Sequence, residues 1–195
     1  IASISKLLTV YLVERAIEAG KLTMDTPVSV PASIVAISTE PGLANVPLST
    51  ERTYTVRELT EMALIKSANA AALALGYAVS GTPTGVNQEI QDLLTSWGID
   101  DTTIVSGAGL TNGDMVALKN PNLGDDVENE LSARELAIVG RHLVEDYPNI
   151  TEITSMTSAV VPSGATGTET IKNSNSLLTD GHGYDFKGLK TGYTL

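Results

Sequence analysis

The segment spanning residues 3–18 constrains the fold most, because it is apolar on nearly every side of a helix. Its apolar members are Ile4, Leu7, Leu8, Val10, Tyr11, Leu12, Val13, Ala16 and Ile17. A helix without a polar face has to be covered on all sides by other parts of the protein. We therefore expect this helix in the middle of a domain, ending near Gly20, a residue suited to a helix C-terminus.

Local signals predict further helices along the chain. Thr55-Val56-Arg57-Glu58 and Ser132-Ala133-Arg134-Glu135 both have the form of a capping box, so a helix is expected from Thr55 to about residue 65 and another from Ser132 to just before Pro148. After a short break, an Ala-rich helix is expected through Val79. The segment from Pro83 to Trp97 fits a helix that begins with proline and is followed by glycine.

The remaining segments indicate loops and strands. Residues 21–54 lack a helical period and predict loops with short strands. Residues 104–130 are rich in glycine and predict a long functional loop. Hairpins are expected from residue 158 onward, and residues 186–193 are typical of a strand.

Composition excludes several classes of function. A chain of 195 residues can bury a substantial core, and its formal charge of -11 argues against nucleic acid, whose binding proteins need a basic surface. No block of Lys or Arg indicates a membrane surface, so membrane association is expected only through regions absent from this chain. The absence of cysteine fits an extracytoplasmic protein, although many cytoplasmic proteins also lack cysteine.

Ser3-Ile4-Ser5-Lys6 stands at the start of the apolar helix. Residues three apart lie on one helix face, so the Ser3 hydroxyl and the Lys6 amine can form a hydrogen bond. A serine hydroxyl needs a nearby base to become a nucleophile, and a lysine can serve once burial or neighbouring cations lower its pKa. Ser3 is thus a candidate nucleophile, with Lys6 as its base.

Two further motifs can supply the rest of an active site. Ser67-Ala68-Asn69 lies at the break between two helices, where a hydroxyl can relay a proton and an amide can hold a peptide group. Lys190-Thr191-Gly192 lies on the expected last strand, where a cation and a hydroxyl can hold a carboxylate and glycine lets a substrate backbone approach.

The order Ser-x-x-Lys, Ser-x-Asn, Lys-Thr-Gly resembles that of the penicillin-recognising serine enzymes. Five segments are similar to the D-alanyl-D-alanine carboxypeptidases of low molecular mass among them, and together they span the chain. They begin at Ala2, Ile65, Leu131, Asn173 and Gly188, and the last ends at Thr194. The resemblance implies an α+β fold of the β-lactamase/D,D-peptidase type.

The resemblance also implies the chemistry. Ser3 would attack the penultimate peptide bond of a peptidoglycan stem peptide that ends in D-Ala-D-Ala, with Lys6 as base, and water would hydrolyse the acyl-enzyme. Ser67 and Lys190 would relay a proton to the leaving amine. The implied substrate-binding residues are Asn69, which orients the peptide, Thr191, which binds the terminal carboxylate, Gly192, and Tyr193, whose N–H forms the oxyanion hole with that of Ser3. β-Lactams would acylate Ser3, and no cofactor or metal is implied.

The chain departs from the family pattern in two ways. Ser174 stands where some members carry a basic residue between two asparagines. The family's sheet also has strands before the nucleophile and after Lys-Thr-Gly, whereas this chain begins two residues before Ser3 and stops three after Gly192. We therefore expect residues 1–195 to form a single, incomplete D,D-peptidase domain that hydrolyses little or nothing when isolated.

Two alternatives remain open. Glu128-Asn129-Glu130-Leu131 is similar to the Glu-x-Glu-Leu stretch of serine β-lactamases, although its position beside Ser132 predicts a solvated loop end. A non-hydrolytic β-lactam sensor would carry the same motifs. The histidines, His142 and His182, stand outside the motifs, so we expect them to have packing or surface roles rather than to form a Ser-His-Asp triad or a zinc site.

Overall fold

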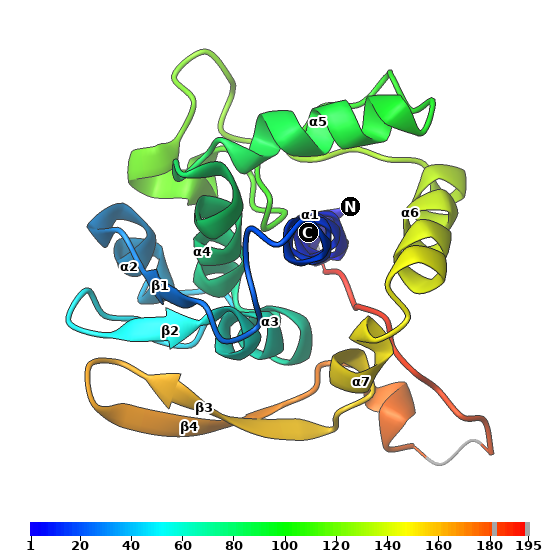
Figure 1. The fold of residues 1–195 in the computed structure, drawn as a ribbon. Helices are drawn as coiled ribbons and strands as arrows, with labels where there is room; N and C mark the ends of the chain where they lie inside the picture. The colour runs from blue at the N-terminus through cyan, green and yellow to red at the C-terminus, as the bar shows by residue number, and fades with distance from the viewer. Residues whose placement is uncertain (181–182, 194–195) are drawn as a thin grey trace.

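The computed structural model describes residues 1–180 and 183–193. Its central element is the helix α1 (Lys6–Glu18), preceded by the 3-10 turn η1 (Ala2–Ser5). Ten of its thirteen residues are buried, and α1 contacts α3, α4, α5 and α6, which surround it in Figure 1. The expectation of a central helix is confirmed, and Gly20 follows its end with a φ of 70°.

The predicted helices are present, with small shifts at their ends. These helices are α3 (Val56–Ile65), α4 (Asn69–Ser80), α5 (Val86–Ser96) and α6 (Ala133–Asp146). Both capping boxes form as predicted, at Thr55 and at Ser132. Helix α5 begins three residues later than expected, because residues 83–85 form a turn instead.

The segment at residues 21–54 contains one helix that the sequence did not predict. Besides the short strands β1 (Pro27–Ser29) and β2 (Thr53–Thr55), which pair antiparallel, it forms α2 (Ala32–Ser38). Helix α2 has seven residues, too few to show a clear helical period. It is held by packing, since Ile34 and Ile37 are fully buried.

The C-terminal part forms α7 (Ile150–Thr154), a hairpin of β3 (Ser158–Ser163) and β4 (Gly167–Lys172), and the turn η3 (Ser176–Leu178). The hairpin lies beneath α3 in Figure 1. The prediction of a strand over residues 186–193 is wrong: this segment is irregular. A strand requires a hydrogen-bonded neighbour, and no described strand pairs with these residues.

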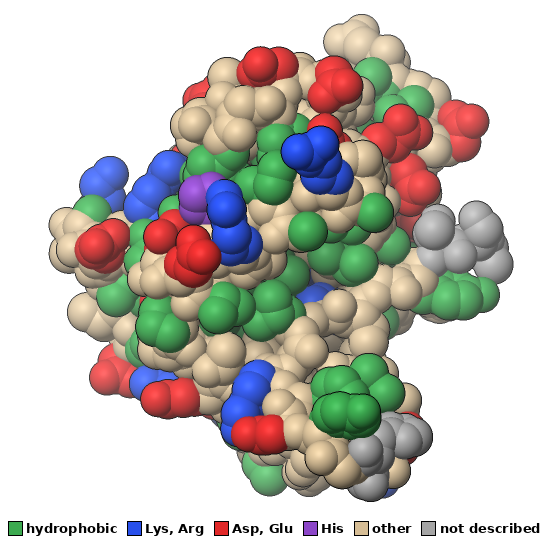
Figure 2. Space-filling view, turned by 90° about the vertical axis from the view of Figure 1, so that its right-hand side faces the viewer, with side chains coloured by type: hydrophobic (Ala, Val, Ile, Leu, Met, Phe, Trp, Pro, Cys, Tyr) green, Lys and Arg blue, Asp and Glu red, His purple; other side chains and the backbone are tan. Residues whose placement is uncertain are grey.

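The loop at residues 104–130 lies on the side of the molecule opposite the hairpin of β3 and β4 (Figure 1). It contains the turn η2 (Gly113–Leu118) and is joined at its base by a bridge between Thr103 and Glu130. On the face shown in Figure 2, acidic side chains gather at the upper right, whereas acidic and basic side chains lie side by side on the left. Within the described residues, no helix combines the length and hydropathy that crossing a bilayer requires.

Candidate active site

An open cleft of about 770 Å³ lies where the three motifs meet. Its walls are formed by the turn η1, the segment before α4, the loop after α2, the loop at residues 104–130 and the C-terminal segment. The residues that line it are Ala2, Ser3, Gly42, Leu43, Ala44, Lys66, Ser67, Asn69, Gly109, Leu110, Thr111, Asp114, Asp126, Glu128, Ser174, Thr191, Gly192 and Tyr193. Six of the eight predicted site residues are among them.

The remaining two predicted residues are Lys6 and Lys190, which are not among the lining residues. The Lys6 side chain is completely buried at the base of the cleft, and its Nζ lies 2.8 Å from Ser3 Oγ. The same Nζ lies 2.8 Å from Asn69 Oδ1 and 2.7 Å from the carbonyl oxygen of Ala108. The pair predicted from the Ser-x-x-Lys spacing therefore forms, together with two acceptors.

These three contacts fit either protonation state of Lys6: an ammonium can donate to all three oxygens, and a neutral amine can donate to two of them and accept from the Ser3 hydroxyl. A neutral amine has two N–H donors and one lone pair, whereas the oxygens of Asn69 and Ala108 can only accept. Once both N–H groups are donated to these oxygens, the lone pair is left facing the Ser3 hydroxyl. Burial, followed by the charge of Lys190, lowers the pKa of Lys6 well below its ordinary value. The lowered pKa favours the neutral form of Lys6, and the geometry places its amine where it can accept the proton of Ser3.

The Ser67 side chain is positioned by an uncommon backbone conformation. It lies between α3 and α4 with a φ of 66°, a value that costs a non-glycine residue roughly 1–3 kcal/mol. Its hydroxyl is largely buried in the wall of the cleft and makes no hydrogen bond to the residues that the structure describes. An unpaired hydroxyl in the cleft that Ser3 also lines is suited to bind a reacting group.

Asn69 is held from two directions. Its Nδ2 donates to the carbonyl oxygen of Ala44, while its Oδ1 accepts from Lys6. The backbone N–H of Asn69 also donates to Ala44. The amide is thus fixed in one orientation, with its oxygen toward the base.

Thr191 and Gly192 of the Lys-Thr-Gly segment line the cleft, whereas Lys190 is not among its lining residues. Lys190 Nζ donates to the backbone oxygen of Thr191 at 2.8 Å, and no hydrogen bond among the described residues joins it to Ser67. Partial burial lowers the pKa of Lys190 to about 8. The Thr191 hydroxyl lies 2.6 Å from that of Ser174, and Tyr193 is largely exposed at the rim. The direct Ser67–Lys190 contact that a proton relay needs is not formed.

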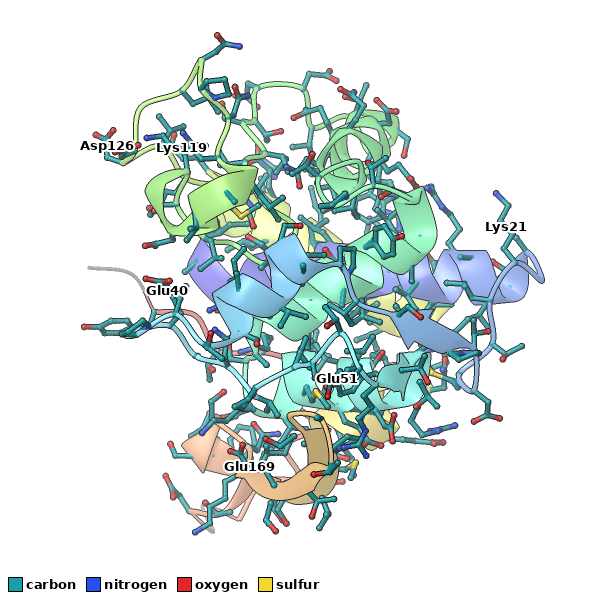
Figure 3. All side chains as sticks on the ribbon, turned by 90° about the vertical axis from the view of Figure 1, so that its left-hand side faces the viewer. Lys21, Glu40, Glu51, Lys119, Asp126 and Glu169 are labelled. Carbon is teal, nitrogen blue, oxygen red and sulfur yellow. The ribbon has the colours of Figure 1, made fainter. Side chains whose placement is uncertain are left out.

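The wall contributed by the loop at residues 104–130 is acidic. Asp114, Asp126 and Glu128 all line the cleft, and Figure 3 shows Asp126 beside Lys119 on this loop. Glu128 is partly exposed and Glu130 is exposed, as expected for a loop end, and Glu128 also lines the cleft. Asn129, the next residue, is buried.

His142 is not among the residues that line this cleft. His142 lies on α6, where its ring stacks on that of Trp97 with centroids 4.3 Å apart. His182 lies outside the described residues, as does Thr194. In the described part of the chain, no group of three or more His, Cys, Asp and Glu side chains is arranged to hold a metal ion.

Gly109 brings the loop against the nucleophile turn. With a φ of 76°, it approaches η1 so closely that an added Cβ would lie 1.8 Å from the carbonyl oxygen of Ala2, the residue before Ser3. We expect Gly109→Ala to lower the free energy of unfolding by about 3 kcal/mol, the combined cost of a left-handed alanine and an overpacked contact. Acylation of Ser3 should slow as well, because the clash displaces the backbone beside it.

Gly164→Ala is a matched control for this prediction. Gly164 also has a positive φ, 61°, but an added Cβ would meet nothing within 4 Å. It should therefore lose only the conformational part, about 1 kcal/mol, in denaturant unfolding. Equal losses for the two variants would contradict the role of the close approach at Ala2.

Comparison with known proteins agrees with the motifs. The family model described as D-alanyl-D-alanine carboxypeptidase matches residues 1–195. The chain is 26% identical over 195 residues to D-alanyl-D-alanine carboxypeptidase DacA of Haemophilus influenzae. The match covers 99% of this chain and 44% of that protein. It is 24% identical over 193 residues to DacF of Bacillus subtilis, with the same coverage. The chain thus spans less than half the length of these curated relatives.

Solved structures give the same result. A peptidoglycan synthesis regulatory factor (PBP3) from Streptococcus pneumoniae is 39% identical with a TM-score of 0.90, and the match covers 100% of this chain and 53% of that one. Penicillin-Binding Protein D2 from Listeria monocytogenes, in an ampicillin-bound form, is 27% identical with a TM-score of 0.72, covering 100% and 69%. The α+β, D,D-peptidase-like fold expected from the sequence is confirmed.

Proposed function

The chain belongs to the D-alanyl-D-alanine carboxypeptidase family, and from this premise we propose that it is the catalytic part of a serine D,D-carboxypeptidase. Its substrate is a peptidoglycan stem peptide ending in D-Ala-D-Ala, from which it removes the terminal D-alanine. The observation that carries the proposal is the Lys6 amine, buried and directed by Asn69 and Ala108 toward Ser3 Oγ. Peptidoglycan lies outside the cytoplasm, so the proposal places the protein in the bacterial cell envelope.

The reaction begins with proton transfer from Ser3 to Lys6. Ser3 Oγ bonds to the carbonyl carbon of the penultimate D-alanine, and the backbone N–H groups of Ser3 and Tyr193 stabilise the resulting oxyanion. The C–N bond then breaks, a proton passes to the leaving amine, and D-alanine departs. In the second half of the reaction the oxygen of a water molecule bonds to the ester carbon and its proton passes to Lys190. The C–O bond to Ser3 then breaks, and Lys6 returns its proton to Ser3 Oγ.

The other residues act on the substrate and on the departing proton. The unpaired Ser67 hydroxyl is the group that hands a proton to the leaving nitrogen, with Lys190 supplying that proton after a side-chain movement away from Thr191. Thr191, supported by the Ser174 hydroxyl, binds the terminal carboxylate, and Asn69 orients the peptide. β-Lactams present a carbonyl and a carboxylate in a similar arrangement and acylate the same Ser3.

Release of D-alanine from an N-acylated peptide ending in D-Ala-D-Ala tests this function. The native full-length protein should release one D-alanine per peptide, and labelling by a fluorescent penicillin should compete with release. A non-hydrolytic sensor would be labelled without releasing D-alanine, which would overturn the proposal.

A serine β-lactamase is the second candidate, and the position of Glu128 in the cleft wall is the observation that favours it. If Glu128 activates a deacylating water, the protein will turn over penicillin rapidly and Glu128→Gln will accumulate the acyl-enzyme. For a carboxypeptidase we expect a long-lived penicillin adduct in both proteins. The decay rate of the labelled protein separates the two.

The pH dependence of kcat/KM should report Lys190. Its pKa is lowered to about 8, so Lys190 is charged below that pH and neutral above it. The proposed role requires the charged form, and kcat/KM should therefore fall as pH rises through about 8, since this parameter reports the free enzyme. Lys190→Arg should lack this decline, because a guanidinium stays protonated, but its kcat/KM should be lower below pH 8, because a guanidinium does not release the proton that Ser67 passes on. A wild-type profile that is flat to pH 10 would contradict the role of the Lys190 charge.

A further inference from the structure

The turn at residues 105–109, which presents the Ala108 carbonyl to Lys6, is held almost entirely by side chains. It belongs to no helix or strand, yet residues 105–108 are buried. Buried backbone groups have to find partners, and an irregular segment cannot take them from a regular ladder. The partners of this turn therefore show what fixes its position.

Asn129 holds the first half of the turn. Its Oδ1 accepts from the backbone N–H groups of Val105 at 2.6 Å and Ser106 at 3.1 Å, and its Nδ2 donates to the carbonyl of Ser106 at 2.7 Å. The same Nδ2 donates to the Ser5 hydroxyl at 2.9 Å, inside the nucleophile turn. One fully bonded side chain thus ties the turn to η1.

Asn87, near the start of α5, holds the turn from the other side. Its Nδ2 donates to the carbonyl of Val105 at 2.6 Å, and its Oδ1 accepts from the N–H of Gly107 at 3.1 Å. The Gly107 carbonyl accepts from Thr9 Oγ1, and the Ala108 N–H donates to Ser106 Oγ. The Ala108 carbonyl is then the remaining group, and its partner is Lys6.

Every backbone N–H and C=O group of residues 105–108 is thus hydrogen-bonded. The Ala108 carbonyl is the group among them that accepts from Lys6. We propose that Asn129 and Asn87 are positioning residues for catalysis: by fixing the 105–109 turn, they hold the Ala108 carbonyl where it orients Lys6 toward Ser3 and keeps water from its amine. This inference rests on the proposed function, because it assigns a role relative to Lys6 as the base.

Few charges lie close to Lys6, so a change in its pKa caused by loosening of the 105–109 turn can be measured separately. Its direct contacts are the neutral groups of Ser3, Asn69 and Ala108, and the charge that acts on it among the described residues is that of Lys190. The carboxylates of Asp114, Asp126 and Glu128 lie in the cleft wall. Loosening the turn admits water to the amine, which relieves the desolvation that disfavours its protonated form.

The test is the pH profile of Ser3 acylation by a chromogenic β-lactam in the native full-length protein. Asn129→Ala and Asn87→Ala should each lower the acylation rate constant about 100-fold near neutral pH, the scale of a misplacement of about 1 Å. The acidic limb should also move to higher pH by about 1 unit, as partial hydration of a buried lysine predicts. The difference in acylation rate constant between variant and wild type should shrink as pH rises, because Lys6 then becomes neutral in both proteins. Deprotonation of Lys190, by contrast, would lower the rate constant as pH rises.

Asn112→Ala is the matched control. Asn112 is equally buried and its side chain makes four hydrogen bonds to backbone groups, but these hold residues 120–124, and none of them joins the 105–109 turn. Its removal should destabilise the protein without moving the acidic limb. If Asn129→Ala does not fold, the acidic limb of Asn87→Ala tests the inference, since Asn87 is only half-buried.

Unchanged acidic limbs in the folded Asn129 and Asn87 variants, or a shift of the same size in Asn112→Ala, would overturn the inference and leave these asparagines as structural residues. Failure of the proposed function is a different outcome: the wild-type protein itself would then show no acylation that depends on Ser3.

Discussion

Lys6→Met should lower the rate constant for acylation of Ser3 about 10,000-fold, at the upper end of what general base catalysis contributes. Methionine fills nearly the volume of the lysine side chain but has no basic nitrogen, so the proton of Ser3 has no acceptor at 2.8 Å. The oxygens of Asn69 and Ala108 also lose their donor, which costs about 1–3 kcal/mol for each buried acceptor left unpaired. Burst-phase measurements with a chromogenic β-lactam, corrected for the folded fraction, give the rate constant.

Lys66→Met is the control for this effect. Lys66 lines the same cleft but has no contact with Ser3 Oγ. Its removal should change acylation less than about tenfold, as expected for a partly exposed cation that only steers a charged ligand. A loss of less than tenfold for Lys6→Met would show that another group accepts the proton.

Ser3→Ala should abolish release of D-alanine, with a loss in kcat of about a million-fold, the scale seen when other serine hydrolases lose their nucleophile. The Ser3 side chain, whose hydroxyl is hydrogen-bonded to Lys6, is only half-buried. Because it lies outside the core, its truncation to alanine leaves no cavity there. Thermal unfolding should therefore remain close to that of the wild type. Residual release above that of an uncatalysed control would require a second nucleophile.

Local sequence signals predicted much of the helical part and the core of the site. The capping boxes at Thr55 and Ser132 each depend on four adjacent residues, and the Ser3–Lys6 contact depends on three residues of spacing. Such interactions form wherever the local backbone does. The break that places Ser67 between two helices could be predicted for the same reason.

Contacts between distant segments could not be predicted in this way. Ala108 lies 102 residues from Lys6 and Asn129 lies 124 from Ser5, so nothing in either neighbourhood indicates the pairing. The position of Glu128 in the cleft wall likewise depends on how the long loop folds back. Strand propensity alone suggested a strand over residues 186–193, but strand pairing is a property of two segments, and the described residues supply no partner.

The central claim is that Ser3 is the residue that forms the acyl-enzyme, and the site of covalent attachment tests it most directly. After incubation of the native full-length protein with benzylpenicillin, intact-mass measurement followed by peptide mapping should find one β-lactam per chain, attached to Ser3, and none in Ser3→Ala. Attachment at Ser67 or at another residue, or an adduct that persists in Ser3→Ala, would contradict the account.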